Sequence, residues 1–492
     1  MIALTVTLLL PALGALLLAG LRSQVLAGWL NVAIAASGFV TSVWLALTVL
    51  DQGALGGDQF YIDHFNVYLI TLTAFVGFST ALFSRPYMQH EIERGRVTPL
   101  RLRLYHGSYQ GFLFAMLLAL STNNLGVLWF ALEGATLATV LLVSLYRTPE
   151  SVEAAWKYFI LCGVGIAQAL FGTVLLYLAA SRLGVASDQA LLWSVLHHDA
   201  ARLEPAIMAI AFTFLLVGYG TKVGLVPLHN WLPDAHSEGP TPISAVLSGL
   251  LLNVALYAVV RIKILTDAAL HAGKLHTPHL AGYFMMGFGL LSFLVAALFL
   301  HRQRDIKRLY SYSSIEHMGL MTFAFGLGVP LATFGALLHM TVHSLTKSAI
   351  FVTVGHASQI AGTQVMERIR GLIDTQPAVG WGLMIGTLAI AGFPPFGVFT
   401  SEFLLLTSTM QTWPWLTVAL LSGLAIAFAG LFRHLQPMVF GAQPEGQAAI
   451  RVNMVPVAAH LLLVLWLGLA IPNWLAGWFD SATRLISGSG LL

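Results

Sequence analysis

The sequence places one acid and one lysine inside apolar segments, where ionisable side chains are rare. Glu133 lies in LGVLWFALEGATLATVLLVSLY, about 12 Å past the start of that run at a helical rise of roughly 1.5 Å per residue. Lys222 lies in GYGTKVGLVPLHNWLPDAH. A buried acid is costly unless it is paired or protonated, and a lysine beside it keeps both groups ionised. Because the same lysine left alone would lose its proton, the couple can carry protons; a static buried ion pair is the plainer alternative.

Three titratable residues follow one stripe of another apolar segment, FGALLHMTVHSLTKSAIFVTVGHAS. His339, His343 and Lys347 are spaced i, i+4 and i+8, so on a helix they lie on one face at intervals of about 6 Å. Such groups can pass a proton along with intervening waters. A single histidine there would more often be a core residue, but three in register favour a proton relay.

Further ionisable residues lie in or beside apolar runs. Glu402 follows the Pro-Pro pair of IAGFPPFGVFTSEF; the alternative role for it is a helix-start acid that accepts from freed backbone N–H groups. Glu316 and His317 in YSSIEHMG add two more titratable groups to the membrane interior. Lys157 in EAAWKYFILC lies near the end of its run and can extend its amine toward the interface.

The turn HNWLPDAHSEGPTP carries a cluster of polar side chains. His229 and His236 bracket it, with Asp234 and Glu238 between and after them, so we expect a polar mouth. A pair of metal-binding histidines is the alternative, but the spacing matches no standard site and we expect no metal. The single cysteine, Cys162, excludes a disulfide framework, a CxxC zinc site and a cysteine-bound iron–sulfur cluster. We expect no cofactor of the chain's own.

The composition indicates where such residues must be held. Only 24 basic and 21 acidic residues occur among 492, so 9% of the chain is charged, against about 25% in soluble globular domains. Hydrophobic residues make up 57%, and the mean hydropathy is +0.80. This composition excludes a water-soluble enzyme, a secreted scaffold and a disordered protein, and leaves an integral membrane protein. A net charge of +3 also predicts no binding to nucleic acid.

Fourteen apolar runs approach the length of about 20 residues that a spanning helix needs. We therefore predict an all-α polytopic membrane protein with about fourteen transmembrane helices, in which the first run stays in the protein because no basic residue precedes it. The runs cover residues 2–21, 26–50, 65–83, 108–122, 124–146, 155–180, 205–226, 243–264, 280–300, 306–327, 331–360, 379–407, 413–434 and 453–478.

Basic residues are unequally divided between the two sets of connecting loops. Six are assigned to one side: Arg182, Arg202, Arg261, Lys263, Lys274 and Arg484. The other side has fifteen: Arg22, Arg85, Arg94, Arg96, Arg101, Arg103, Arg147, Arg302, Arg304, Lys307, Arg308, Arg368, Arg370, Arg433 and Arg451. By the positive-inside rule the richer side is cytoplasmic, which places both termini outside the cytoplasm of a prokaryotic inner membrane.

Two of the apolar runs are interrupted by helix-breaking residues. The seventh contains Gly224 and Pro227, and the twelfth contains GFPPFG at residues 392–397. Proline removes a backbone donor and clashes with the preceding turn, so each helix should break there. Matched broken helices are typical of inverted-repeat transporters; ordinary proline kinks are the alternative.

Several of these segments together resemble one known family. GTKVGLVPLHNWLPDAHSEGPTPISAVLSGLLLNVALYAVVRI resembles the antiporter-like membrane subunits of respiratory complex I, Mrp-type sodium/proton antiporters and membrane-bound group 4 hydrogenases. The likeness continues through DIKRLYSYSSIEHMG, HMTVHSLTKSAIFVTVGH and GFPPFGVFTSEF, and covers roughly residues 60–435. The IEHMG, HSLTKS and LLN details most resemble the hydrogenase-4 type F component.

The resemblance implies a domain organisation. Fourteen core helices would include two inverted five-helix repeats, each with a broken helix at its centre. The expected divisions are helices 1–3 in residues 1–107, a first repeat of helices 4–8 in 108–264, a second repeat of helices 9–13 in 280–434, and helix 14 in 453–492.

The resemblance also implies roles for the buried residues. Glu133 and Lys222 would be the ion pair of the first repeat. The second repeat would contribute one lysine, two histidines and one acid: Lys347, His339, His343 and Glu402. The chain departs from many members at Asn253, where a lysine or histidine is frequent. An amide holds water but carries no proton, so we expect the link there to use waters, His229 or other groups.

We therefore predict a proton-translocating membrane subunit of a multi-subunit redox-driven complex, moving H⁺ along a buried Glu/Lys/His axis. Its expected partners are other antiporter-like and membrane-anchor subunits, soluble hydrogenase- or quinone-reductase-like subunits, and the lipid bilayer. The possible accessory residues are Lys157, His236, Asn253, Glu316 and His317.

Three alternatives remain. The subunit can belong to a multi-subunit cation/proton antiporter or be the energising subunit of an inorganic-carbon transporter. Its seventeen histidines also permit a haem- or quinone-binding membrane oxidoreductase, although a shared helix face for His339 and His343 suits a file of water better. A purely structural scaffold would leave the buried ionisable residues unexplained.

Overall fold

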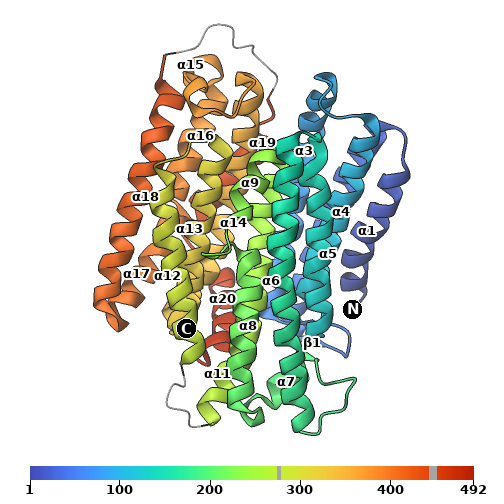
Figure 1. The fold of residues 1–492 in the computed structure, drawn as a ribbon, viewed down its shortest axis with the longest axis vertical. Coiled ribbons are helices and arrows are strands. Elements are labelled where there is room, and N and C mark those ends of the chain that lie inside the picture. The colour runs from blue at the N-terminus through green and yellow to red at the C-terminus, as the bar shows by residue number, and fades with distance from the viewer. Residues whose placement is uncertain (274–278, 443–451, 492) are drawn as a thin grey trace.

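Long α-helices run side by side along the longest axis of the molecule (Figure 1). The computed structural model describes residues 1–273, 279–442 and 452–491. Two short antiparallel strands, β1 (Leu55–Gly56) and β2 (Tyr61–Ile62), lie between the second and third helices. The helices of the first half are α1 (Ile2–Gly20), α2 (Gln24–Gln52), α3 (His64–Glu93), α4 (Pro99–Ser121), α5 (Leu125–Val143), α6 (Pro149–Arg182), α7 (Trp193–His198), α8 (Pro205–Val223), α9 (Trp231–Glu238), α10 (Thr241–Val246) and α11 (Leu252–Ala272).

A π-helical turn joins α10 to α11, so the two form one continuous rod. The second half of the chain contributes the remaining helices. These are α12 (Leu280–Leu300), α13 (Ile306–Leu327), α14 (Pro330–Ala361), α15 (Leu372–Thr375), α16 (Pro377–Ile390), α17 (Gly397–Thr412), α18 (Pro414–Phe440), α19 (Val455–Leu469) and α20 (Asn473–Ser487).

The helix boundaries follow from residues that the sequence supplies at each start. Helices α4, α6, α8, α14, α16 and α18 begin at a proline, which has no N–H to leave unsatisfied at the first helical position. At the start of α3, the Asp63 side chain accepts from the backbone N–H of Asn66, whose own side chain accepts from the backbone of Asp63. These residues fix the positions at which the helices begin.

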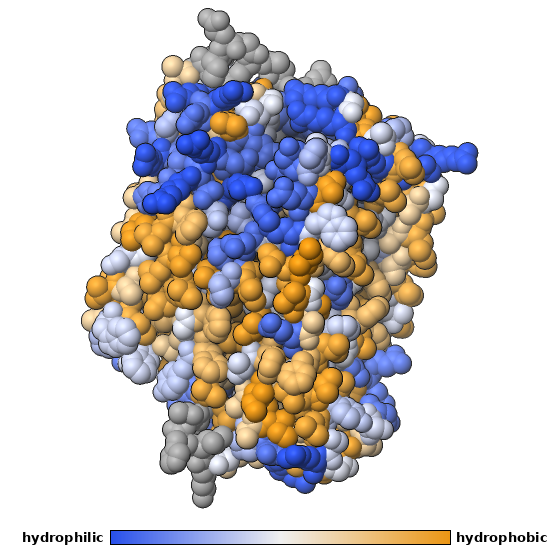
Figure 2. Space-filling view, in the orientation of Figure 1, coloured by the Kyte–Doolittle hydropathy of each residue, from blue (hydrophilic) through white to orange (hydrophobic). Residues whose placement is uncertain are grey.

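The surface supports the prediction of a membrane protein. Among the described residues, nine helices are long and apolar enough to cross a membrane, or ten if α19 and α20, bent by 80°, make one span. Figure 2 shows hydrophobic residues over the middle of the molecule and a dense hydrophilic zone at its upper end. The chain is thus a helical polytopic membrane protein, as predicted.

The expected number of fourteen helices stays a prediction. Two elements that were counted as one apolar run, α16 and α17, are 14 and 16 residues long, and each is shorter than a span of about 20 residues. The run expected at 108–122 belongs to a longer helix, α4, whose first turns carry arginines. By length and apolarity alone, α4, α16 and α17 cannot be counted as spans.

Both predicted interruptions are present. Helix α8 ends at Gly224, which has a φ of 84°, and α9 begins only at Trp231. Helix α16 ends at Ile390, and α17 begins at Gly397, with Gly392 between them at a φ of 67°. Because positive φ is strained for residues with a Cβ, glycine is required at both turns.

Close helix contacts depend on glycine elsewhere. A Cβ added at Gly218 of α8 would lie 2.6 Å from the carbonyl oxygen of Gly165 on α6. A Cβ at Gly319 of α13 would lie 2.7 Å from the carbonyl oxygen of Gly289 on α12. Small residues let backbones approach in this way in membrane bundles, and they hold α6 against α8 and α12 against α13.

Three basic residues were assigned to the wrong structural context by the sequence. Arg261 and Lys263 lie within α11 and Lys307 lies in the first turn of α13, and all three are buried rather than in loops. All three fall within the expected runs 243–264 and 306–327, and they were counted with the loops because charged residues were expected there. Lys274 and Arg451, also counted there, lie outside the described residues.

Candidate functional site

The predicted acid–lysine couple is brought together in the first half of the bundle. The Nζ atom of Lys222, in the last turn of α8, lies 3.4 Å from Oε2 of Glu133 on α5, and it also contacts the hydroxyl of Thr136. The Lys222 side chain is fully buried, whereas 21% of the Glu133 side chain is exposed. A cation in the last turn of a helix is favoured by the helix dipole. The break at Gly224 therefore positions Lys222 where its charge is stabilised.

Lys347 lies in a second buried centre, between α14 and α13. Its Nζ atom donates a hydrogen bond to the carbonyl oxygen of Tyr310 at 3.0 Å and lies 5.9 Å from the centre of that ring. Glu316 of α13 is the acid whose charge acts on Lys347. The Oε2 atom of Glu316 is buried and has no hydrogen-bond partner among the described residues. A buried amine and an acid with open hydrogen-bonding capacity thus face the same region.

Three histidines continue from this lysine. His317 of α13 and His339 of α14 share a hydrogen bond of 3.0 Å between Nδ1 and Nε2. The ring of His343 is centred 5.6 Å from that of His317, and both of its nitrogens lack a partner within the described chain. All three side chains are buried. The stripe predicted on α14 is present, and α13 adds His317 to it.

Glu402 closes the cluster from the broken helix. Its Oε1 atom lies 3.9 Å from Nδ1 of His317, and the neighbouring Ser401 hydroxyl bonds Nδ1 of His339 at 2.9 Å. A Cβ added at Gly392 would lie only 2.0 Å from Oε2 of Glu402, so the glycine in the break makes room for the carboxylate. Glu402 is in the second turn of α17, beyond the free N–H groups of the first turn, so the helix-start alternative is wrong.

The predicted translocation residue His229 and the accessory residues Lys157 and His236 occupy three different settings. Lys157 of α6 pairs with Asp234 of α9, so its amine reaches a partner rather than the interface alone. His229 lies beside Tyr312, with ring centres 6.3 Å apart. His236, at the other end of the same turn, is fully buried, and its ring stacks on that of Phe351 in α14. The two histidines of the turn therefore do not converge on a common ligand.

The expected polar mouth is a cavity of about 710 Å³ whose lining includes Asp234 and Glu238. Asp234 accepts from Lys157 on one side and from Arg308 of α13, at 2.5 Å, on the other. This carboxylate joins α6, α9 and α13. Among the residues that the structure describes, no group of three or more His, Cys, Asp or Glu side chains is arranged as metal ligands.

Asn253 lies at the start of α11 and contacts α14, the helix that carries the second centre. Its Nδ2 atom donates to the carbonyl oxygen of Met340 at 3.1 Å and to the hydroxyl of Ser344 at 2.7 Å. The Oδ1 atom is buried without a partner in the described part of the chain. The amide thus anchors α11 to α14 and leaves one acceptor for water.

Buried charges that the sequence did not single out lie at the two ends of the bundle. Arg261 of α11 forms a two-pronged ion pair with Asp63, at 2.7 and 2.8 Å. Lys307 donates to two backbone carbonyls at the end of α9. Two residues before it, Asp305 caps the start of α13. Burial raises the pKa of the Asp305 carboxyl, and the hydrogen bond that it accepts from the Arg308 backbone partly offsets this rise. The signal for Lys307 was its place within the apolar run expected at 306–327.

Comparisons with known proteins identify the family and the fold of the chain. The family described as "NADH:quinone oxidoreductase/Mrp antiporter, TM" matches residues 122–428. The chain is 50% identical to the "Hydrogenase-4 component F homolog" of Methylacidiphilum infernorum over 97% of its length and 98% of that relative. It is 28% identical to "NADH-quinone oxidoreductase subunit N" of Desulforudis audaxviator, over 84% of this chain and 81% of that one. A chain of the membrane-bound sulfane sulfur reductase, an archaeal respiratory membrane complex, has the same fold, with a TM-score of 0.86 and 23% identity over 98% of this chain and 97% of that one.

Proposed function

The chain belongs to the NADH:quinone oxidoreductase/Mrp antiporter transmembrane family, and we propose that it translocates protons as one membrane subunit of a larger redox-driven complex. The named relatives support this assignment, since one is a hydrogenase-4 component homologue and another is a subunit of an NADH-quinone oxidoreductase. The energy for the movement would come from partner subunits.

The first step uses the ion pair of the first half. While Glu133 stays 3.4 Å from Lys222, its carboxylate favours the charged amine. A change in a neighbouring subunit that separates the pair removes this stabilisation from a fully buried lysine. Lys222 then gives up its proton to the hydrated groups between the two centres, among which Asn253 and His229 can hold water.

The second step uses the cluster of the second half. Lys347 accepts the proton as a neutral amine, and the histidines carry it to Glu402 for release on the opposite side. A neutral imidazole accepts a proton at one nitrogen and donates from the other, so each ring returns to its starting charge.

One observation carries the proposal. His343, His317 and His339 form a buried group in which the rings are hydrogen-bonded or in contact, with Glu402 at 3.9 Å from His317 and Lys347 one helical turn after His343 on α14. A structural scaffold would satisfy such groups with fixed partners, because unpaired buried polar atoms are costly. Here both nitrogens of His343 and one oxygen of Glu402 are left open to water. Open hydrogen-bonding capacity along a series of titratable groups is what proton transfer requires.

The fold is proposed to contain fourteen membrane-spanning segments in two inverted repeats. The broken segments α8–α9 and α16–α17 would occupy equivalent positions in the repeats, within residues 108–264 and 280–434. Residues 1–107 and 453–492 would flank them. Both termini would face away from the cytoplasm; in Figure 1 both lie in the lower half of the molecule, away from its hydrophilic upper end in Figure 2.

The assembled complex in sealed vesicles tests the function. Lys222→Ala and Glu402→Gln should each abolish redox-driven proton uptake, while the subunit content of the purified complex stays normal. Gly134→Ala is the matched control next to Glu133, because a Cβ there meets nothing within 4 Å. Unchanged proton movement in both charge variants, with normal assembly, would contradict the proposal.

The same vesicles separate proton pumping from cation exchange. If the chain serves a multi-subunit cation/proton antiporter, an imposed sodium gradient will drive proton flux without any redox substrate. An inorganic-carbon transporter would instead co-purify with a large soluble partner and move protons only with bicarbonate present. A redox-driven subunit gives neither result.

A further inference from the structure

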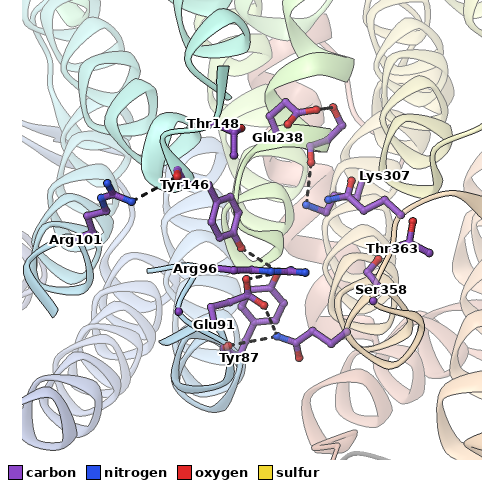
Figure 3. Close-up of a pocket in the computed structure, with 15 residues that line it drawn as sticks. Tyr87, Glu91, Arg96, Arg101, Tyr146, Thr148, Glu238, Lys307, Ser358 and Thr363 are labelled. Atoms are coloured by element: carbon purple, nitrogen blue, oxygen red, sulfur yellow. Dashed lines mark hydrogen bonds and ion pairs between the residues drawn. The ribbon is translucent and has the colours of Figure 1, made fainter. Parts of the chain in front are cut away.

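A polar cavity of about 500 Å³ lies toward the hydrophilic end of the molecule and has no part in the mechanism above. Figure 3 shows Glu238 and Lys307, from α9 and α13, on one side of it, and Tyr87, Glu91 and Arg96, from α3 and the turn after it, on the other. Both halves of the chain therefore supply its walls. Its charged lining makes it a space that water can fill.

The inner wall of the cavity is built around a buried lysine. Lys307 is 1% exposed, and its Nζ atom donates to the carbonyl oxygens of Ser237 at 3.1 Å and Gly239 at 2.8 Å. These carbonyls lie at the end of α9, where a cation is favoured by the helix dipole. The carboxylate of Glu238, between the two carbonyls in sequence, lines the cavity and accepts from the Ser237 hydroxyl at 3.3 Å.

The outer wall is also charged. Glu91 of α3 is fully buried; Oε1 accepts from Nε2 of Gln359 at 3.0 Å, and Oε2 lies 3.5 Å from Arg96. Acidic and basic groups therefore face each other across the space, and the cavity attracts water rather than an ion of one sign.

Behind the inner wall lies His236, a buried histidine whose ring nitrogens have no hydrogen-bond partner among the described residues. It directly precedes Ser237 and is fully buried. Its ring stacks on Phe351 at a centre-to-centre distance of 5.0 Å. Phe351 follows Lys347 by one helical turn on α14, so the two side chains share a face. The amines of Lys307 and Lys347 are the two that lie near enough to His236 to act on it electrostatically.

We propose that this cavity is the entrance through which protons reach the buried cluster, and that His236 relays them from the cavity to Lys347. The proposal rests on the proposed function, because it adds a second supply of protons to Lys347, beside the one from Lys222. The neutral ring takes a proton from water on the cavity side at one nitrogen. The proton on its other nitrogen then passes to the neutral amine of Lys347, and the ring is neutral again.

The neighbouring cavity is a weaker candidate for the entrance. It shares Glu238 with the first, but its central acid, Asp234, is already paired with Lys157 and Arg308. Its wall includes Tyr312, beside which His229 lies, rather than His236. Ser237, which directly follows His236, lines the first cavity and is absent from the lining of the second.

The first experiment compares variants of the assembled complex in vesicles. His236→Gln, which keeps a polar side chain but cannot carry a proton, should lower proton translocation by about tenfold or more. His106→Gln is the matched control, since His106 is another buried histidine with a nitrogen that lacks a partner in the described chain. If Lys347→Met stops translocation and His236→Gln does not, the entrance is wrong and the proposed function stands. If neither variant has an effect, the proposed function itself fails.

A second experiment excludes a merely structural effect of the substitution. Thr363→Cys places a thiol at the cavity, and Glu153→Cys places one at the neighbouring cavity. A bulky membrane-impermeant thiol reagent should slow proton uptake in the first variant and leave the second, and the unsubstituted complex, unchanged. The single native cysteine, Cys162, is buried and should not react. Full activity of labelled Thr363→Cys would overturn the entrance.

Discussion

Nδ1 of His317 lies 3.0 Å from Nε2 of His339 and 3.9 Å from Oε1 of Glu402. One nitrogen of one ring therefore faces both another imidazole and a carboxyl group, from three different helices. A proton on that nitrogen can be donated to only one of them at a time. The choice of acceptor is the step at which we expect the second half of the chain to be sensitive to substitution.

Substitution of His339 should interrupt the relay. His339→Gln removes the ring that bonds both His317 and Ser401, so proton translocation should fall by about 100-fold. Ser401→Ala removes one orienting hydrogen bond and should cost only about threefold to tenfold, as expected for a net loss of roughly 1 kcal/mol. Initial rates of proton uptake in vesicles, normalised to complex content, measure both. Equal losses in the two variants would show that His339 acts through the orientation of the cluster and does not itself carry the proton.

The glycine at the second break should matter for the carboxylate it accommodates. Gly392→Ala adds a Cβ that would lie 2.0 Å from Oε2 of Glu402, at a φ of 67° that disfavours alanine. The displaced carboxyl should lower proton translocation by about tenfold or more, since misplacing a reacting group by roughly 1 Å is costly. Gly163→Ala, where a Cβ meets nothing within 4 Å, is the control. Normal pumping by Gly392→Ala would show that Glu402 has room to move without loss.

The ion pair between Arg261 and Asp63 should contribute to stability rather than to transport. Removing one partner leaves a buried charge uncompensated, so Arg261→Met should destabilise the subunit by about 3–5 kcal/mol. Arg261→Lys keeps the charge but not the two-pronged geometry, and should restore only part of the loss. Thermal unfolding of the purified chain in detergent measures the differences, and proton transport by any folded Arg261→Lys complex should be unchanged.

Substitution of Asp234, which joins three helices, should destabilise the protein more than substitution of its partner Lys157. Lys157→Met removes one partly exposed ion pair and should cost about 0.5–1 kcal/mol. Asp234→Asn removes two pairs and leaves Lys157 and Arg308 as like charges near each other, so it should lower the melting temperature further. A double Lys157→Met, Asp234→Asn variant that is no worse than Asp234→Asn alone would confirm that both act through the same contact.

Local patterns predicted the elements and the individual centres. The spacing of His339, His343 and Lys347 specifies a helix face, and the glycines and prolines at residues 224–227 and 392–397 specify the breaks, because both are properties of one segment. The pair of Glu133 with Lys222 followed from the cost of leaving either group alone in lipid.

Contacts between helices could not be read from the same patterns. Nothing in YSSIEHMG says that His317 meets Glu402, because that contact depends on how α13, α14 and α17 dock. Arg261 and Asp63 are 198 residues apart, and their pairing rests on the same kind of docking. Lys307 was assigned to a loop because charged residues of membrane proteins are expected there, although it falls within the run expected at 306–327.

The position of Asp234 has a mechanical consequence. Since its two oxygens are held by cations of α6 and α13, the short helix α9 is fastened to the earlier and later halves of the chain at a single point. A displacement of α9 must stretch both ion pairs. If α6 and α13 move by different amounts, α9 should therefore tilt about Asp234. His229 and His236 lie on either side of this pivot, and any tilt would bring one toward its neighbours as it draws the other away.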